Sequence, residues 1–339
     1  MSLNYLPLIL ASTFVLALAI TPCIRLLAMH RGIMDHPTAR SSHTVPTPRG
    51  GGLAIVMAYF TALISLEVLG YLTAHELIAL LVGGGAVAVV GFLDDRRSVA
   101  APLRFVVHLS AAIVVVFMIG SFPILELVGS GSHSETINRI VGVAGIAWSI
   151  NLFNFMDGID GIAGAEAVFV SFAAGAIIFW MGGDMGLVGA LACLGMAALG
   201  FLVWNWPPAK IFMGDIGSGF LGFMLAALGI LASHHLTISI QVWPILGGVF
   251  LVDASVTLIR RIGRRDKWHQ AHRTHAYQQL TQVWNGHLPV TLFVCAVNIC
   301  WLLPWACYAA SHPTFATRGC AIALSPLVLG ALWAGAGKP

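Results

Sequence analysis

The sequence predicts an all-α membrane protein, a polytopic bundle of about 11 transmembrane helices that forms a single domain over residues 1–339. Two observations predict this fold class. Of the 339 residues, 58% are hydrophobic and only 9% are charged, whereas an ordinary soluble domain has about 25% charged residues. The apolar residues also run on continuously instead of alternating with polar ones, which favours helices over the strands of a membrane barrel.

Eleven apolar segments are each long enough to cross a bilayer, whose hydrocarbon core of about 30 Å needs about 20 residues per helix. The first, 5–28, has no lysine or arginine before it and no clear cleavage signal, which favours a retained helix over a signal peptide. The segments that follow begin or end at polar motifs, which set most of their bounds. In chain order they are 50–70 (after PRGGG), 74–93 (before the acid pair of FLDDRRSV), 102–120, 138–155 (into NLFNFMDG), 162–181 (after DGIDG), 186–204, 216–233 (after FMGD), 238–259 (before RRIGRR), 287–310 and 318–336.

The basic residues predict how the bundle is oriented. If the helices alternate in direction, only Arg139 and Arg318 of the 17 lysines and arginines lie on one face, and the others lie on or beside the opposite face. By the positive-inside rule the basic face is cytoplasmic, so the N-terminus is outside and the C-terminus inside. The net charge of +3 then reflects topology and gives no reason to expect nucleic acid. The charge favours binding of either anionic lipid headgroups or phosphate substrates. The sequence leaves the oligomeric state open, a homodimer included.

Three groups of acidic residues fall at cytoplasmic helix ends under this topology. Asp94 and Asp95 end one helix, Asp157 and Asp160 lie in NLFNFMDGIDGIAG, and Asp215 precedes another helix in FMGDIGSG. Carboxylates near hydrocarbon are costly and usually functional. A lone aspartate at a helix end is as often a cap as a ligand, but three groups at one depth indicate a common polar site.

Glycine-rich stretches stand at three helix starts on the same face: PRGGG, DGIDGIAG and GDIGSG. Free N–H groups and the helix dipole at such starts suit an anion, above all a phosphate. The alternative is that small residues simply allow the helices to pack closely. The sequence leaves both explanations open.

The acidic clusters favour a hard divalent cation. Oxygen ligands without cysteine or an ordered carboxylate–histidine pattern favour Mg²⁺, or Mn²⁺ as the alternative, over zinc. Asn154, Asp157 and Asp160 follow one another at intervals of three residues, so they can lie close together at a helix end. A diphosphate bound to such a cation would need carboxylates of this kind beside it.

The loop 260–286 is the longest cytoplasmic segment, and it combines arginines and aromatic residues with three histidines, His269, His272 and His275. Their spacing alone is weak evidence for zinc. The loop is either a solvated basic cluster or a site for an anionic nucleotide-sugar or lipid phosphate. Asp253, about two turns before the loop, is expected to pair with a neighbouring polar group.

An ion-coupled transporter would also have many helices and buried acids. Transport sites usually lie near the bilayer midplane, at broken helices within repeated halves. Here the acids lie at helix ends and the sequence contains no convincing internal repeat. These observations favour an enzyme at the inner membrane surface.

Taken together, the motifs resemble those of one known family, the polyprenyl-phosphate N-acetylhexosamine-1-phosphate transferases. The resemblance extends over almost the whole chain, in order and spacing, through HPTARSSHTVPTPRGGG, GFLDDRRSV, NLFNFMDGIDGIAG, FMGDIGSGFLG, VDASVTLIRR and HRTHAYQQL. It implies transfer of a sugar-1-phosphate from a UDP-N-acetylhexosamine to undecaprenyl phosphate, with release of UMP. It also implies a multi-pass protein of the bacterial inner membrane with its active site on the cytoplasmic face.

The resemblance also implies roles for individual residues. The expected catalytic residues are Asp94, Asp95 and Asp157, and the expected Mg²⁺ ligands are Asp215 and Asn154. The residues expected to bind substrate are His43, Arg49, Asn154, Asp160, Arg273 and His275. Whether Asp94 or Asp95 acts on the lipid phosphate stays open, as does the choice between direct attack and a covalent aspartyl intermediate.

Two departures from the family pattern bear on the branch to which the chain belongs. Tyr277 and Gln278 stand where relatives often have histidines, and Arg96 and Arg97 follow the acid pair where the peptidoglycan branch reaches a lysine. Both departures favour an enzyme that initiates a surface polysaccharide, such as the O-antigen of lipopolysaccharide. The amino sugar itself stays open.

Overall fold

The computed structural model describes residues 5–37, 43, 45–120, 135–235, 238–266 and 273–338. The predicted zinc candidates His269 and His272 lie outside these described residues. The chain is mainly helical where it is described, with one antiparallel pair of short strands, β1 (Met34–Asp35) and β2 (Thr47–Pro48).

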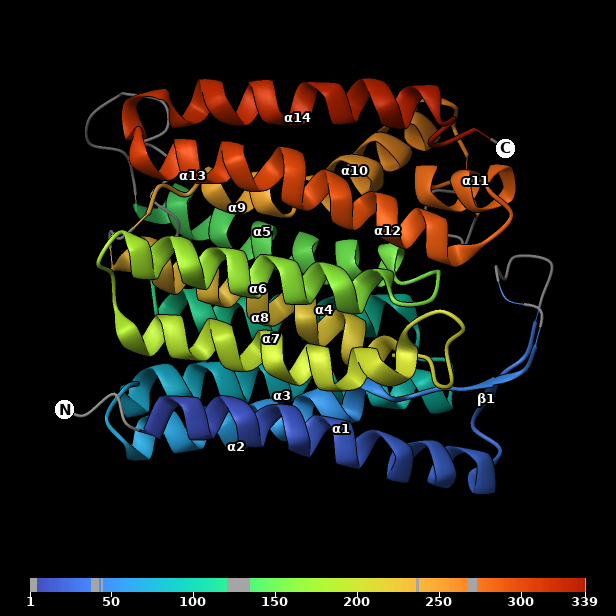
Figure 1. Ribbon diagram of the computed structural model, residues 1–339, viewed down its shortest axis with the longest axis horizontal. Helices are drawn as coiled ribbons and strands as arrows, with labels where there is room; N and C mark the ends of the chain where they lie inside the picture. The colour runs from blue at the N-terminus through green and yellow to red at the C-terminus, as the bar shows by residue number, and fades with distance from the viewer. Residues whose placement is uncertain are drawn as a thin grey trace.

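The long helices run roughly parallel or antiparallel to one another and form a bundle (Figure 1). In chain order they are α1 (Leu6–Arg31), α2 (Gly52–Val68), α3 (Ala74–Arg96), α4 (Ala101–Met118), α5 (Glu135–Met156), α6 (Ile162–Trp180), α7 (Met185–Asn205), α8 (Asp215–His234), α9 (Val242–Leu246), α10 (Gly248–Gly263), α11 (Ala276–Val283), α12 (His287–Val297), α13 (Leu303–Ser311) and α14 (Ala316–Trp333). A π-helical turn, η3 (Asn298–Leu302), joins α12 to α13, and a 3₁₀ turn, η4 (Pro313–Phe315), precedes α14.

The predicted all-α membrane fold is confirmed. Among the described residues, nine helices are long and apolar enough to cross a membrane, and α2 is an apolar helix of 17 residues. Each of the eleven predicted segments contains a helix, while the number of crossings stays a prediction.

The prediction of one helix over 238–259 was wrong, because the structure has α9 and α10 with a break at Gly247. Two consecutive glycines offer no side chains to stabilise a continuous helix there. Gly248 also packs closely against other helices, since a Cβ on it would lie 2.8 Å from Leu324 Cδ2. Beyond the break, α10 carries Asp253, whose contacts with α11 are described below.

The helix α8 lies at the centre of the bundle, and nearly all of its residues are buried. It packs mainly against α3 and α5, and also against α2. Small residues make these approaches possible, because a Cβ on Gly222 would lie 2.3 Å from Ser149 O and one on Gly52 would lie 2.2 Å from Gly217 Cα. Close packing at small residues is the usual way in which membrane helices associate, and here it fixes the start of α8 beside α2, α3 and α5.

One buried carboxyl group lies in the first turns of α6, outside the polar cavity described below. Glu166 of α6 is 1% exposed, and Asn298 Nδ2 donates a hydrogen bond of 2.5 Å to its Oε2. Asn298 begins the π-helical turn η3. An extra residue in a helical turn moves a side chain around the helix axis, so the turn accounts for how Asn298 reaches α6.

The two chain ends lie at opposite ends of the bundle (Figure 1). The acidic motifs that follow α5 and precede α8 lie at the same bundle end as the last turn of α3. Arg139 and Arg318 lie near the starts of α5 and α14, at the other end. Arg139 and Arg318 thus lie at the bundle end opposite the acidic motifs, as the predicted topology requires. That the end with the acidic motifs is cytoplasmic still follows only from the positive-inside rule.

Candidate active site

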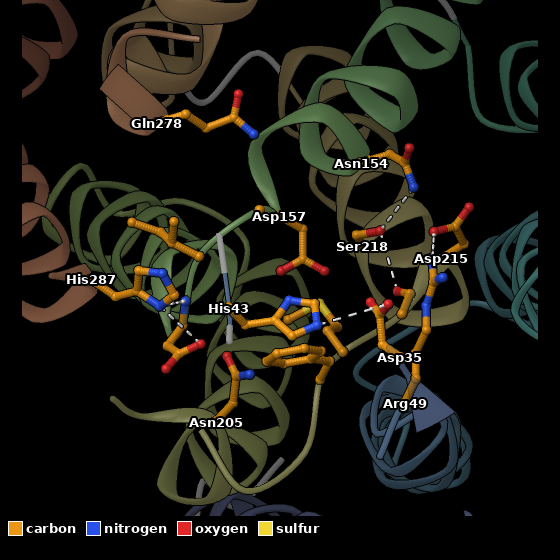
Figure 2. Close-up of a pocket in the computed structure, with 16 residues that line it drawn as sticks. Asp35, His43, Arg49, Asn154, Asp157, Asn205, Asp215, Ser218, Gln278 and His287 are labelled. Carbon is orange, nitrogen blue, oxygen red and sulfur yellow. Dashed lines mark hydrogen bonds and ion pairs between the residues drawn. The ribbon is translucent and has the colours of Figure 1, made fainter. Parts of the chain in front are cut away.

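A polar cavity of about 230 Å³ lies at the bundle end where α5 stops and α8 begins (Figure 2). Its wall combines acids, amides, histidines and one arginine. The lining residues are Asp35, His43, Arg49, Asn154, Asp157, Gly158, Ile159, Asp160, Asn205, Phe212, Met213, Gly214, Asp215, Ser218, Gln278 and His287. The structure therefore brings together six residues that the sequence predicts for the site: His43, Arg49, Asn154, Asp157, Asp160 and Asp215.

Arg49 lies between two carboxylates at one side of the cavity. It follows β2 and is held in place by Phe212, whose N–H donates to Pro48 O at 2.8 Å. Its Nε lies 2.8 Å from Asp95 Oδ1, and its Nη2 lies 2.5 Å from Asp215 Oδ1. Burial lowers the pKa of the Arg49 guanidinium, but Asp215 and Asp95 raise that pKa by more, so the net pKa lies above its ordinary value. Arg49 is thus a fixed cation at the cavity wall.

A second arginine, Arg104 of α4, reaches the same carboxylate from the other side. Its Nη1 pairs with Asp94 and lies 3.3 Å from Asp215 Oδ2. Asp94 is held as well by the Val99 N–H, which donates to its Oδ1 at 2.6 Å. Asp215 is therefore bracketed by two guanidinium groups from different elements, a charge pattern suited to holding phosphate oxygens.

Asp95 is a cap for the central helix. Its side chain is 2% exposed, and its two oxygens accept hydrogen bonds from the N–H groups of Asp215 (2.9 Å) and Ile216 (3.2 Å). A carboxylate at this place satisfies N–H groups that no helical turn can satisfy. Asp94 and Asp95 are not among the residues that line the cavity, although Arg104 and Arg49 connect them to Asp215. Their catalytic role stays a prediction.

Gly214 is required for this capping arrangement. Its φ of 78° lies in the left-handed region, and a Cβ on it would lie 2.4 Å from Asp95 Oδ2. We expect Gly214→Ala to destabilise the protein by about 1–3 kcal/mol, because the alanine strains the backbone and displaces the cap. A thermal melt in detergent would measure the loss. Gly263→Ala serves as the control, since a Cβ there meets nothing within 4 Å, and an equal loss in both variants would contradict the explanation.

Backbone N–H groups at two of the predicted anion-binding helix starts are already used by the protein. At PRGGG, Gly51 N–H donates to Phe212 O and Gly52 N–H to Met213 O, both at 2.9 Å. At the start of α8 the anion is the protein's own Asp95. The prediction of free N–H groups for phosphate was wrong for these two motifs, and the close-packing alternative holds for PRGGG. The arginines remain to bind a phosphate.

Asp157 lies immediately after α5, with its carboxylate directed into the cavity (Figure 2). Burial raises the pKa of Asp157 well above its ordinary value; Arg49 lowers it, and the carboxylates of Asp215 and Asp95 raise it further. Nearby, Asn154 Nδ2 donates to Ser218 Oγ at 3.3 Å, which connects the end of α5 to α8. The charged form of Asp157 is therefore unfavourable at this buried position, and a bound cation would stabilise it.

Asp160 joins the DGIDG turn to two other elements. Its Oδ1 lies 3.1 Å from His287 Nδ1, at the start of α12, and its Oδ2 accepts from Ala209 N–H at 3.0 Å. Thr291 Oγ1 donates to the Asp160 carbonyl at 3.0 Å. Burial raises the pKa of Asp160, but the bonds from His287 and Ala209 lower it by more, so the carboxyl's net pKa is below its usual value. Asp160 thus stays ionised and holds the turn in place.

The structure does not bring Arg273 and His275 into the cavity wall. His275 is 3% exposed, and its Nδ1 lies 3.3 Å from Asp253 Oδ1 on α10. The prediction that Asp253 pairs with a polar neighbour is confirmed. The helix α11 begins immediately after His275, so Gln278, one turn later, faces the cavity instead.

Sequence reasoning missed Gln278 and His287 as cavity residues. Gln278 did give a signal, since it stands where relatives often have a histidine, but that departure was used only to choose the branch of the family. His287 also gave one, since it is the first residue of an apolar helix at the end where the acids gather. A polar residue at that depth is costly unless it serves a site or a partner.

An apolar groove leads away from the polar cavity. A space of about 100 Å³ includes Asn154 and Asp215, which also line the cavity, together with Arg104, Phe105 and Asn151. Phe105 and Asn151 in turn line an open apolar pocket of about 710 Å³ between α4 and α5. The charged site is therefore joined, through shared residues, to a groove that a hydrocarbon chain could enter from the membrane.

The donor set suits Mg²⁺. Asp157, Asp215, Asn154 and Ser218 offer only oxygen ligands, which hard divalent cations prefer. Among the described residues, no group of three or more His, Cys, Asp or Glu side chains could hold a metal by itself. Mg²⁺ is commonly bound by one or two carboxylates together with substrate phosphates and water. The residues therefore fit an ion that binds together with a phosphorylated substrate.

These features define a multi-pass membrane protein in which a charged, oxygen-rich cavity meets an apolar groove. Comparison with known proteins agrees with that class. The family model described as Glycosyl transferase family 4 matches residues 77–233. The chain is 32% identical over 277 residues, 77% of this chain and 74% of the relative, to the probable undecaprenyl-phosphate N-acetylglucosaminyl 1-phosphate transferase of Bacillus subtilis (strain 168).

Two further relatives extend the range of named activities. A decaprenyl-phosphate N-acetylglucosaminephosphotransferase of Mycobacterium tuberculosis (strain ATCC 25618 / H37Rv) is 28% identical over 305 residues, 80% of this chain and 74% of the relative. A phospho-N-acetylmuramoyl-pentapeptide-transferase of Frankia alni is 33% identical over 272 residues, 68% of this chain and 72% of the relative. The chain belongs to the polyprenyl-phosphate N-acetylglucosamine-1-phosphate transferase family, within glycosyl transferase family 4.

Proposed function

We propose that the protein transfers an N-acetylated sugar-1-phosphate from a UDP-N-acetylhexosamine to undecaprenyl phosphate and releases UMP. The reaction would take place at the cytoplasmic face of the bacterial inner membrane and would initiate a surface polysaccharide, such as an O-antigen chain. One observation carries the proposal: Asn154 and Asp215 line both the charged cavity and the start of the route to the apolar groove. A water-soluble diphosphate and a lipid phosphate could meet there.

In the proposed reaction an oxygen of the lipid phosphate attacks the phosphorus that carries the sugar. The bond from that phosphorus to the bridging oxygen breaks, and UMP leaves with the electron pair. Such a transfer depends mainly on positioning and on neutralising charge. Arg49 and Arg104 lie on opposite sides of Asp215, so they can bind oxygens of two phosphates at once. Direct attack needs no enzyme nucleophile, because a lipid phosphate dianion is itself a nucleophile.

The acidic residues would have different roles in this reaction. Arg104 pairs with Asp94 and lines the route to the groove, so Asp94 is better placed than Asp95 to orient the lipid phosphate through that arginine. Asp95 would position Asp215, whose backbone it caps. Asp215 and Asp157, with Asn154, would hold Mg²⁺. That ion would supply charge neutralisation to the diphosphate and to the departing UMP.

The relatives support this proposal through their names, which include undecaprenyl-phosphate and decaprenyl-phosphate N-acetylglucosamine transferases. The phospho-N-acetylmuramoyl-pentapeptide-transferases among them make the peptidoglycan donor the natural competitor. Transport is the less suitable alternative, since the acids gather at one end of the helices and transport sites usually lie near the midplane.

A donor panel tests the proposal. Purified protein in detergent, with undecaprenyl phosphate and Mg²⁺, should release UMP with a UDP-N-acetylhexosamine and not with UDP-N-acetylmuramoyl-pentapeptide. EDTA should abolish turnover, and Mg²⁺ or Mn²⁺ should restore it, because the oxygen ligands suit hard cations. No turnover with any donor in a folded preparation would refute the enzyme assignment. Turnover with the pentapeptide donor alone would refute the surface-polysaccharide role.

A further inference from the structure

The short helix α11 is fixed to α10 by one buried carboxylate. Asp253 is 4% exposed, and its Oδ1 and Oδ2 accept hydrogen bonds of 2.9 Å from the N–H groups of Ala276 and Tyr277. Thr257 Oγ1 donates to the same carboxylate at 3.1 Å. The first N–H groups of a helix have no partner within it, so Asp253 satisfies two of them. The start of α11 therefore has a defined position relative to α10.

From that position Tyr277 reaches the end of α5. The side chain is 3% exposed, and its hydroxyl donates a hydrogen bond of 3.0 Å to Phe155 O. The last carbonyls of a helix lack partners within it, and here a phenol supplies one. The same hydroxyl rests against the next residues of the chain, since a Cβ on Gly158 would lie 2.1 Å from Tyr277 Oη. Tyr277 thus contacts the turn 155–158 at both of its ends.

Asp157 lies inside this turn. Its N–H donates to Phe153 O at 3.1 Å, while no hydrogen bond or ion pair to another described residue holds its carboxylate. The direction of the carboxylate therefore depends on the backbone of residues 155–158. Tyr277 fixes that backbone from outside α5 through its hydrogen bond to Phe155 O, and Gln278 packs beside it, since a Cβ on Gly158 would lie 3.1 Å from Gln278 Nε2.

We propose that Tyr277 is a positioning residue: its hydroxyl holds the turn 155–158 so that the Asp157 carboxylate is aimed into the cavity, and Asp253 anchors it. The inference rests on the proposed function, because aiming Asp157 matters for catalysis only if Asp157 takes part in the transfer. The bond itself contributes modestly to stability, as most single hydrogen bonds do. A displacement of about 1 Å in a reacting group can nevertheless cost about 100-fold in rate.

The first measurement tests the contact without any substrate. In Tyr277→Phe, hydrogen–deuterium exchange of the segment 155–161 should become about five-fold faster, as expected when one hydrogen bond is lost. Tyr59→Phe is the matched control. Tyr59 is fully buried in α2, and its hydroxyl has no hydrogen-bond partner among the described residues, so the same atom is removed without loss of a bond. Unchanged exchange in Tyr277→Phe would overturn the proposed contact.

The second measurement tests the catalytic consequence. Tyr277→Phe should lower kcat by about 10- to 100-fold, with the KM for the UDP-sugar within about two-fold of wild type and an unchanged kcat in Tyr59→Phe. A merely structural role would instead lower the amount of folded protein without changing the kcat of what remains. A higher KM at constant kcat would also overturn the proposal.

A double variant asks whether Tyr277 acts through Asp157. In an Asp157→Glu background, where the carboxylate is already displaced by one methylene, Tyr277→Phe should lower kcat by no more than about two-fold, since coupled sites are not additive. Equal losses in both backgrounds would show that Tyr277 acts elsewhere. If wild-type protein released no UMP, the proposed function would fail, and the exchange measurement would still decide the contact.

Discussion

Replacing Asp157 with asparagine is expected to abolish sugar-phosphate transfer and, at the same time, to stabilise the protein that lacks substrate. We expect kcat to fall on the order of 10³-fold, because the Mg²⁺ that would neutralise the phosphate charge loses a carboxylate ligand, and loss of one such electrostatic stabiliser costs up to about that much. The substitution keeps the size of the side chain and removes its charge. UMP release measures the rate, and a thermal melt in detergent measures stability.

The expected gain in stability follows from the raised pKa of Asp157, whose first cause is burial. A carboxyl group with a higher pKa in the folded state binds its proton more tightly there than in the unfolded chain. Ionisation therefore destabilises the folded protein, and this effect is absent below the usual pKa of roughly 4 and complete above the folded value. The asparagine variant should exceed wild type in melting temperature, and by more at about pH 8 than at about pH 5.

Glu135→Gln is the control for this experiment. Glu135 is an exposed carboxylate at the other end of α5, and Arg139 in the next turn is its one ion-pair partner among the described residues. Removing its charge should change neither turnover nor melting temperature, since exposed pairs contribute little. An active Asp157→Asn enzyme would contradict the role of Asp157, and a variant less stable than wild type at alkaline pH would contradict the explanation based on burial.

Replacing Arg49 with glutamine is expected to impair both stability and activity. Arg49 is the cation between Asp95 and Asp215, and its loss leaves Asp95 with only its backbone N–H partners and Asp215 with Arg104 as its remaining cation. Breaking a buried pair costs about 3–5 kcal/mol, and we expect about 2–3 kcal/mol here because a third of the Arg49 side chain is exposed. Turnover should fall by about 100-fold or more, since a charged hydrogen bond to phosphate is also lost.

The stability and activity effects of Arg49 can be separated by temperature. Assays well below the melting temperature of the variant should still show the loss in turnover, because in the proposed reaction the guanidinium would bind the substrate phosphates as well as stabilise the fold. Arg318→Gln, at the other end of the bundle, is the matched control and should behave as wild type. A variant that melts earlier but turns over normally would make Arg49 a structural residue.

The sequence by itself determined the class of fold and the composition of the site. Continuous apolar segments specify membrane helices because no other structure satisfies the backbone in lipid, and polar residues within such a chain are too costly to be incidental. For this reason Asn154, Asp157, Asp160 and Asp215 could be predicted from the residues themselves, whereas His43 and Arg49 followed from the family resemblance, and all six line one cavity. The glycine-rich pattern also predicted close helix packing at PRGGG, as one of two explanations for those glycines.

Only the tertiary structure decided which group each polar residue contacts. Asp95 looks like Asp94 in the sequence, yet it caps α8, and His275 turns to Asp253 while Gln278 and His287 face the cavity. Periodicity states which residues share a helix face, but the contacts between faces depend on where helices cross and where they break, as α9 and α10 do at Gly247. Hydrogen bonds act over about 3 Å, a scale that only the packing of distant segments can fix.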